Sequence, residues 1–97
     1  MHPPFDLARL RARFPSGYVD SARRATLTSA VVCHGLTEDD LGQQSFCSEM
    51  SARREWADAN CRCDYVVEPI RDRQSRLVGR VFRFADANEA FAFKMRF

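Results

Sequence analysis

The pattern of apolar and polar positions is clearest in the last third of the chain, from Cys61 to Phe97. Over residues 61–70 the side chains alternate between two faces. One face carries Cys61, Cys63, Tyr65 and Val67, and the other carries Arg62, Asp64, Val66 and Glu68. This period of two, with Tyr and Val enriched, predicts a strand with one buried face. Pro69 cannot donate to a ladder, so this strand lies at a sheet edge or ends there.

A second strand is predicted over residues 77–84, after a polar loop at residues 71–76. The two strands form an antiparallel hairpin in this interpretation, although the loop lacks the Asn-Gly signal of the tightest turns. The alternation of the second strand is imperfect, because Arg80 shares the parity of Phe82 and Phe84. Gly79 beside Arg80 is typical of a bulge that shifts the phase.

A closing helix is predicted to begin at Asp86. Asp86 with Glu89 three residues later is the pattern of a capping box. The helix presents an apolar stripe, formed by Ala90, Phe93 and Phe97 and widened by Phe91 and Met95. We expect these rings to pack across the hairpin as core. The alternative is that one or two of them stay exposed as a docking patch.

The N-terminal half is predicted to be helical. Residues 6–14 have apolar residues at helical spacing and are followed by Pro15, which ends the predicted helix. Its polar side carries Arg9, Arg11 and Arg13. Residues 20–33 are ambiguous, because Leu27, Ala30, Val31 and His34 have helical spacing while Thr and Val enrichment favours a strand. We favour the helix, and the choice for residues 24–33 stays open.

Another helix is predicted to open at Thr37, with Asp40 completing the cap. Gly42 weakens it, and a restart at Ser45 or Ser48 carries the helix on to Asn60. The inward residues are expected to be Phe46, Cys47, Met50, Ala57 and Cys61, with Trp56 at one border and with Arg53, Arg54 and Glu55 in water.

Taken together, these patterns predict a single small α+β domain over residues 1–97. Its N-terminal helices are followed by an antiparallel β-hairpin and by a C-terminal helix packed on the small sheet. An edge strand in so small a sheet offers a place for another copy or another protein to pair, so a homodimer is a reasonable expectation.

The composition is that of a globular protein with nearly balanced charge: 15 basic residues stand against 13 acidic ones, for a net charge of +2. That balance does not by itself point to nucleic acid. No apolar run approaches a membrane span, and no secretory signal is visible. We expect a cytoplasmic protein, or one in the host cytoplasm if a phage encodes it. The excess of Arg over Lys fits a GC-rich bacterial or phage genome.

No pattern in the chain predicts catalysis. The four cysteines lack the paired spacing of structural zinc sites, so we interpret them as free thiols in the core. Cys33 next to His34 is adjacency in sequence, which does not create an oriented nucleophile and base. No nucleophile elbow, phosphate loop or dinucleotide fingerprint is present. We expect a protein that is not an enzyme and needs no cofactor and no metal.

The leading functional hypothesis is a protein that binds another macromolecule. We expect the partner to be a protein, with this chain acting as a bacterial accessory or regulatory factor or as a phage-encoded inhibitor. Arginine on a hairpin is a common recognition device, and the candidate partner-binding residues are Arg71, Arg73, Arg76, Arg80 and Arg83. The alternative is a nucleic-acid-binding regulator that uses Arg23, Arg24, Arg53 and Arg54. The acidic stretch at residues 38–40 opposes a helix-turn-helix of the usual kind, because phosphates would repel it.

Overall fold

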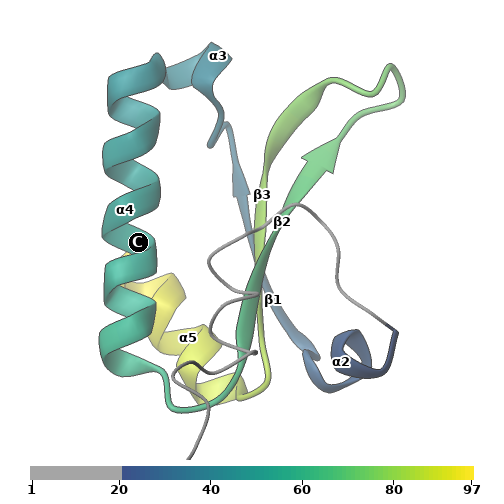
Figure 1. The fold of residues 1–97 in the computed structure, drawn as a ribbon, viewed down its shortest axis with the longest axis vertical. Coiled ribbons are helices and arrows are strands. Elements are labelled where there is room, and N and C mark those ends of the chain that lie inside the picture. Colours follow the sequence, from purple (N-terminus) through teal and green to yellow (C-terminus); the bar gives the residue numbers. More distant parts are fainter. Residues whose placement is uncertain (1–20) are drawn as a thin grey trace, which may run out of the picture.

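The computed structural model describes residues 21–97, and the helix expected over residues 6–14 lies outside them. The fold is α+β, as the sequence predicts. In chain order its elements are α2 (Ser21–Thr26), β1 (Ser29–His34), α3 (Glu38–Leu41), α4 (Gln43–Asn60), β2 (Tyr65–Arg71), β3 (Leu77–Phe84) and α5 (Ala87–Arg96) (Figure 1).

The sheet has three antiparallel strands in the order β1-β3-β2, with β3 in the centre. The predicted hairpin is present as β2 and β3. Pro69 lies on β2, which is an edge strand as its proline indicates. Ile70 pairs with Gly79 and Arg71 pairs with Leu77, so the intervening Val78 is an extra residue. The bulge expected near Gly79 is therefore found one position before it.

The preference for a helix across residues 20–33 is wrong for its second half. Only Ser21–Thr26 is helical, and Ser29–His34 forms β1, which pairs with β3 along its whole length. Val31 and Cys33 are half-buried while Val32 and His34 are exposed, which is the alternation of a strand. The helical spacing of Leu27, Ala30 and His34 was coincidental, because Ala30 and His34 face solvent.

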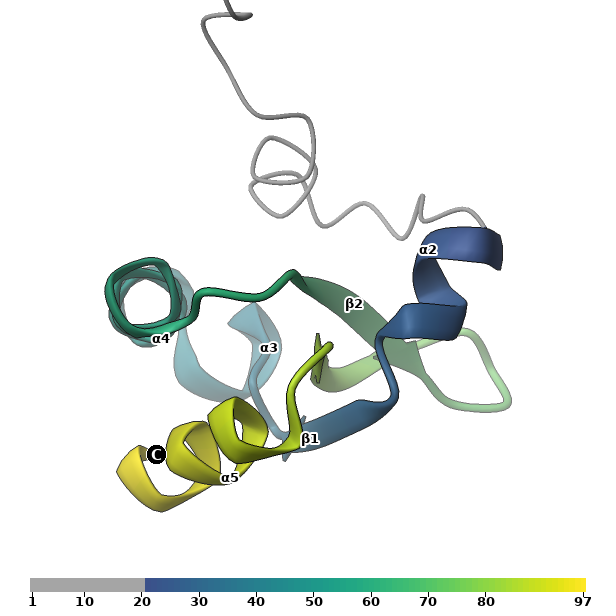
Figure 2. The same ribbon diagram turned by 90° about the horizontal axis from the view of Figure 1, so that it is seen from below.

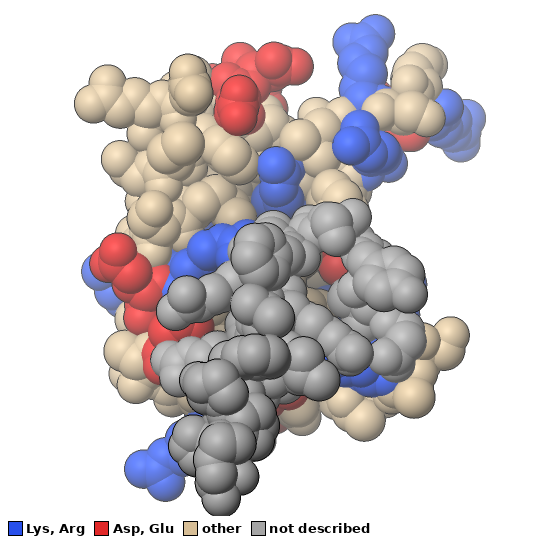
Figure 3. All heavy atoms as spheres, viewed as in Figure 1, with Lys and Arg blue, Asp and Glu red and all other residues tan. Residues whose placement is uncertain are grey.

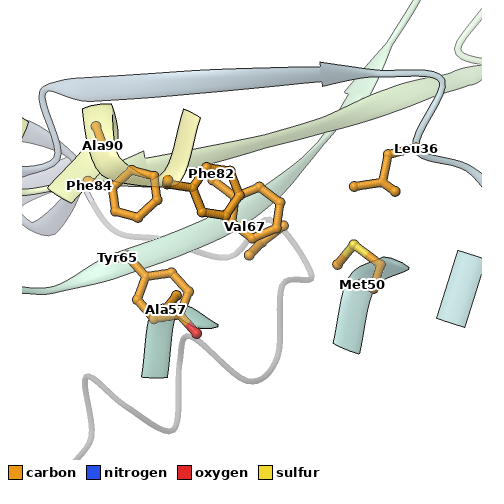
Figure 4. Close-up of a cluster of buried hydrophobic side chains, with 9 residues drawn as sticks. Leu36, Met50, Ala57, Tyr65, Val67, Phe82, Phe84 and Ala90 are labelled. Carbon is orange, nitrogen blue, oxygen red and sulfur yellow. The ribbon is translucent and has the colours of Figure 1, made fainter. Parts of the chain in front are cut away.

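Helices α4 and α5 cover one face of the sheet, and α2 lies beyond the sheet on the other side (Figure 2). The main core lies between the sheet and these two helices (Figure 4). It consists of Leu36, Met50, Ala57, Tyr65, Val67, Phe82, Phe84, Ala90 and Phe93. Phe93 is its centre, with its ring centroid 4.7 Å from that of Phe82 and 5.2 Å from that of Phe84.

Several expected burial assignments are wrong. Phe91 and Met95 do not widen the buried stripe of α5, because they are 65% and 71% exposed. Cys47 and Cys63 are exposed although the pattern placed both inward as core thiols. Arg53 and Arg54 are half-buried although they were expected in water. The first strand begins at Tyr65 rather than Cys61, and Val66 and Glu68 on its second face are also buried.

The predicted helix caps are present. The Asp86 carboxylate accepts from the N–H of Glu89 at 3.0 Å, and Thr37 Oγ1 accepts from the N–H of Asp40 at 3.0 Å. Neither cap forms a reciprocal box, however. Asp40 Oδ2 accepts from the hydroxyl of Thr37 at 2.8 Å rather than from its backbone N–H, and Glu89 does not bond the N–H of Asp86. The Glu89 carboxylate accepts from the backbone N–H of Arg62 at 2.8 Å and ties α5 to the segment before β2. Gly42, with a φ of 84°, divides α3 from α4.

Candidate binding surfaces

The tip of the β2–β3 hairpin carries three exposed arginines, Arg71, Arg73 and Arg76, and we call this set the hairpin arginines. The tip is held by its own hydrogen bonds. Asp72 Oδ1 accepts from the N–H groups of Gln74 and Arg76, both at 2.9 Å, and Arg71 Nη1 donates to the carbonyl of Ser75 at 3.0 Å. The basic side chains gather where the hairpin projects from the molecule, at the upper right of Figure 3. They are thus presented together on an ordered loop.

The other two arginines of the predicted partner-binding set lie elsewhere. Arg80 is on the helix-facing side of β3, with its guanidinium 5.0 Å from the ring centroid of Phe46. Burial lowers the pKa of Arg80, and the charge of Arg71 adds to this effect. Arg83 is on the opposite face, where its Nε donates to Glu68 at 2.7 Å. The structure therefore brings together only three of the five predicted residues.

The arginines of the nucleic-acid alternative are occupied by contacts within the protein. Arg23 makes two bonds of 2.6 Å to the carboxylate of Asp64, and Arg24 pairs with Glu68. Arg53 Nη1 donates to Glu49 at 2.6 Å while its guanidinium stacks on Phe97. Burial lowers the pKa of Arg54. Arg23 and Arg24 lie on α2 and Arg53 and Arg54 on α4, across the sheet from each other, so the four arginines do not form one basic patch.

Glu68 joins two segments of the chain through its ion pairs with Arg24 and Arg83. Burial alone would raise the pKa of this carboxyl group. The hydrogen bonds and charges of the two arginines outweigh that effect, so its pKa lies below the ordinary value. Glu68 is therefore a structural ion-pair partner that fixes α2 against the sheet.

Strand β1 forms an open edge, a feature that the expected helix had concealed. The N–H of Gly35 donates to the carbonyl of Val78 at 2.9 Å. This bond determines which residues of β1 direct their backbone N–H and C=O groups toward β3 and which direct them outward. The backbone groups of Ser29, Val31 and Cys33 point to β3. Those of Ala30, Val32 and His34 point away from the sheet, and within residues 21–97 no hydrogen bond reaches them.

A cleft of about 750 Å³ runs beside this edge. Consecutive residues of β1 and of the turn after it, from Ala30 to Leu36, form one wall. The opposite wall comes from α4 and α5, through Glu49, Arg53, Phe93, Lys94 and Phe97. The cleft is therefore bounded by an unpaired backbone on one side and by aromatic and charged side chains on the other.

The thiols show no sign of activation. Burial raises the pKa of Cys33, and burial with the nearby Glu89 raises that of Cys61 to about 12, so both stay protonated near neutral pH. All four cysteines are free. Residues 21–97 contain no group of three metal-ligating side chains placed to hold one ion, and no helix among them is long and apolar enough to cross a membrane.

Comparison of the chain with protein-family models, curated proteins and solved structures gave no significant match. Function must therefore be argued from the surfaces themselves.

Proposed function

We propose that this protein is a non-catalytic binding protein that recognises an acidic surface of another protein through the hairpin arginines. The observation that carries the proposal is their joint presentation: Arg71, Arg73 and Arg76 are exposed on one ordered tip. Most of the other candidate arginines are paired with carboxylates or buried inside the described part of the molecule.

Arginine suits this task because its planar guanidinium bonds a carboxylate through two parallel N–H groups. The hairpin reduces the entropy cost of binding, because the Asp72 hydrogen bonds already order the backbone of the tip. The net charge of the tip remains positive, since Asp72 is the only acid among residues 71–76.

The test uses a fluorescently labelled polyglutamate peptide as an acidic probe, with labelled duplex DNA and single-stranded RNA beside it. Anisotropy is measured at low and near-physiological salt. The variant Arg73→Glu/Arg76→Glu is compared with the control Arg62→Glu/Arg96→Glu, which makes the same change of net charge at exposed positions away from the hairpin.

We expect the hairpin variant to weaken polyglutamate binding at least tenfold and the control to change it about twofold or less. Equal losses in both variants would show that only net charge matters and would contradict the proposal. Tighter binding of DNA or RNA than of polyglutamate, with a steep decline in salt, would favour the nucleic-acid alternative.

A further inference from the structure

The two edges of the sheet are protected very differently. On β2 the N–H of Ala85 donates to the carbonyl of Asp64, so residues 65, 67 and 69 point outward. Position 69 is a proline without an N–H, and Arg23 donates to the outward carbonyl of Tyr65 at 3.4 Å. The irregularity between Ile70 and Arg71 disrupts the ladder further. Proline, bulges and covering side chains are the means by which natural sheets block pairing at an edge.

Strand β1 has none of these protections among the described residues. Its sequence, Ser-Ala-Val-Val-Cys-His, contains no proline, no lysine and no acidic residue. Val32, in the middle of the strand, is 49% exposed on the face away from α4 and α5. An apolar, unblocked edge strand of this kind is a template for another strand.

Helix α5 carries further exposed apolar side chains. Phe91 and Met95 lie one turn apart on this helix, and both are largely exposed. At about 100° per residue, each lies about 160° around the helix from the fully buried Phe93, so both point away from the sheet. At its α5 side, the cleft beside β1 is lined by Phe93, Lys94 and Phe97 instead. Figure 2 shows α5 and β1 on the same side of the molecule, away from β2.

We propose that β1 pairs with β1 of a second copy of this chain. The pairing is antiparallel about a two-fold axis at Val32. It joins two three-stranded sheets into one of six strands. Val32 pairs with Val32 of the partner subunit, and Ala30 pairs with His34 of the partner subunit.

This register uses every outward backbone group of the strand. Ala30, Val32 and His34 each donate and accept across the axis, because residues that point outward from β1 become its hydrogen-bonded positions in the new ladder. No like charges face each other in these pairs. On the helix side, Val31 lies opposite Cys33 of the partner subunit, beside the cleft.

A second copy fits better than an unrelated extended peptide for two reasons. The strand is compatible with itself, since its central pairs are Val with Val and Ala with His. A peptide would also cover the strand alone, whereas a copy extends the sheet by three strands and places its own α5 on the same face of the joined sheet. One symmetric contact thus pairs the outward backbone groups of both strands and sets the exposed Val32 side chains of the two subunits beside each other.

The test measures molar mass by sedimentation equilibrium from about 1 to 300 μM, together with hydrogen exchange. We expect the wild type to reach twice 11.2 kDa and to protect the amides of Ala30, Val32 and His34 about a hundredfold or more. Val32→Pro removes one outward N–H while leaving the β1–β3 ladder intact. It should remain at 11.2 kDa across the whole range.

Val32→Lys provides a second variant in case the proline disturbs folding, since position 32 is already half-exposed. Ala52→Lys on the solvent side of α4 is the matched control and should dimerise normally. A wild type that stays monomeric throughout would overturn the proposal, as would dimers that persist in both Val32 variants. The proposal is independent of the hairpin arginines: Arg73→Glu/Arg76→Glu should leave the molar mass unchanged.

Discussion

Glu68 is a buried carboxylate that links distant parts of the chain through ion pairs. It bonds arginines that precede it by 44 residues and follow it by 15. We predict that Glu68→Gln lowers the free energy of unfolding at pH 7 by about 2–3 kcal/mol, because it leaves two charged partners without a carboxylate. Urea denaturation measures this loss. Glu55→Gln, an exposed carboxylate on α4, is the control and should change stability by less than about 0.5 kcal/mol.

Comparison of the wild type with Glu68→Gln at different pH values also tests the direction in which the pKa of Glu68 is shifted. The folded pKa of Glu68 lies below its ordinary value of 4.5, so the unfolded chain binds more protons between these two pKa values. The stability from Glu68 is therefore present above pH 4.5 and is lost as the pH falls through the folded pKa. The difference between wild type and Glu68→Gln should shrink when denaturation is repeated near pH 3. A difference that is independent of pH would contradict the ion-pair role.

Gly79 is required for close packing of two strands. A Cβ at this position would lie 2.5 Å from the carbonyl oxygen of Cys33, which is backbone and cannot rotate away. We predict that Gly79→Ala lowers the free energy of unfolding by about 1–3 kcal/mol. The loss should be accompanied by faster amide exchange in β1 than in β2. Wild-type stability together with unchanged exchange would show that the strands relax without cost.

For single residues, the sequence predicts those contacts that join positions close together in the chain. The caps at Thr37 and Asp86 bond residues three positions away, so their spacing can be read directly. Pro69 likewise indicates an edge strand from its own chemistry. Glu68 could not be assigned, because its alternation places it on the polar face and only the tertiary fold brings Arg24 against it.

At the scale of elements, β2, β3 and α5 were predictable because each has its own periodicity and end signals. Strand β1 was not, since six residues of Ala, Val, Ser, Cys and His are compatible with either period. What decides its conformation is the pairing with β3, a contact that is distant in sequence. The cleft beside β1 was missed for the same reason.

Helix α5 is docked mainly by one side chain. Phe93 is fully buried and contacts the rings of Phe82, Phe84, Trp56 and Phe97. We predict that Phe93→Ala costs about 3–5 kcal/mol of unfolding free energy. Phe91→Ala, two positions away on the same helix, removes an equal ring from an exposed site and should cost less than about 0.5 kcal/mol.

Both substitutions are best measured by urea denaturation in the monomeric Val32→Pro background, so that any contribution of Phe91 to the dimer is excluded. Similar losses for the two would mean that α5 is docked through both faces and that Phe91 is not free for a partner.

At the scale of the whole molecule, the sheet formed by residues 21–97 has one blocked edge at β2 and one open edge at β1, and the hairpin projects from one end of it. The strand register places the hairpin beyond His34, at the carboxyl end of β1. A two-fold axis at Val32 reverses the second strand. In the proposed dimer the two sets of hairpin arginines would therefore lie at opposite ends, and the assembly would be bivalent.

Bivalence predicts a density-dependent difference between the wild type and the Val32→Pro monomer on a polyglutamate-coated sensor surface. On a dense coating, both hairpins of one dimer can bind at once, and we expect the wild type to dissociate about tenfold more slowly than the monomer or slower still. On a sparse coating only one hairpin finds a ligand, so the two dissociation rates should agree. Equal dissociation rates of the wild type and the Val32→Pro variant at both densities would contradict bivalent binding. Each set of hairpin arginines would then bind independently, whether or not the chain dimerises through β1.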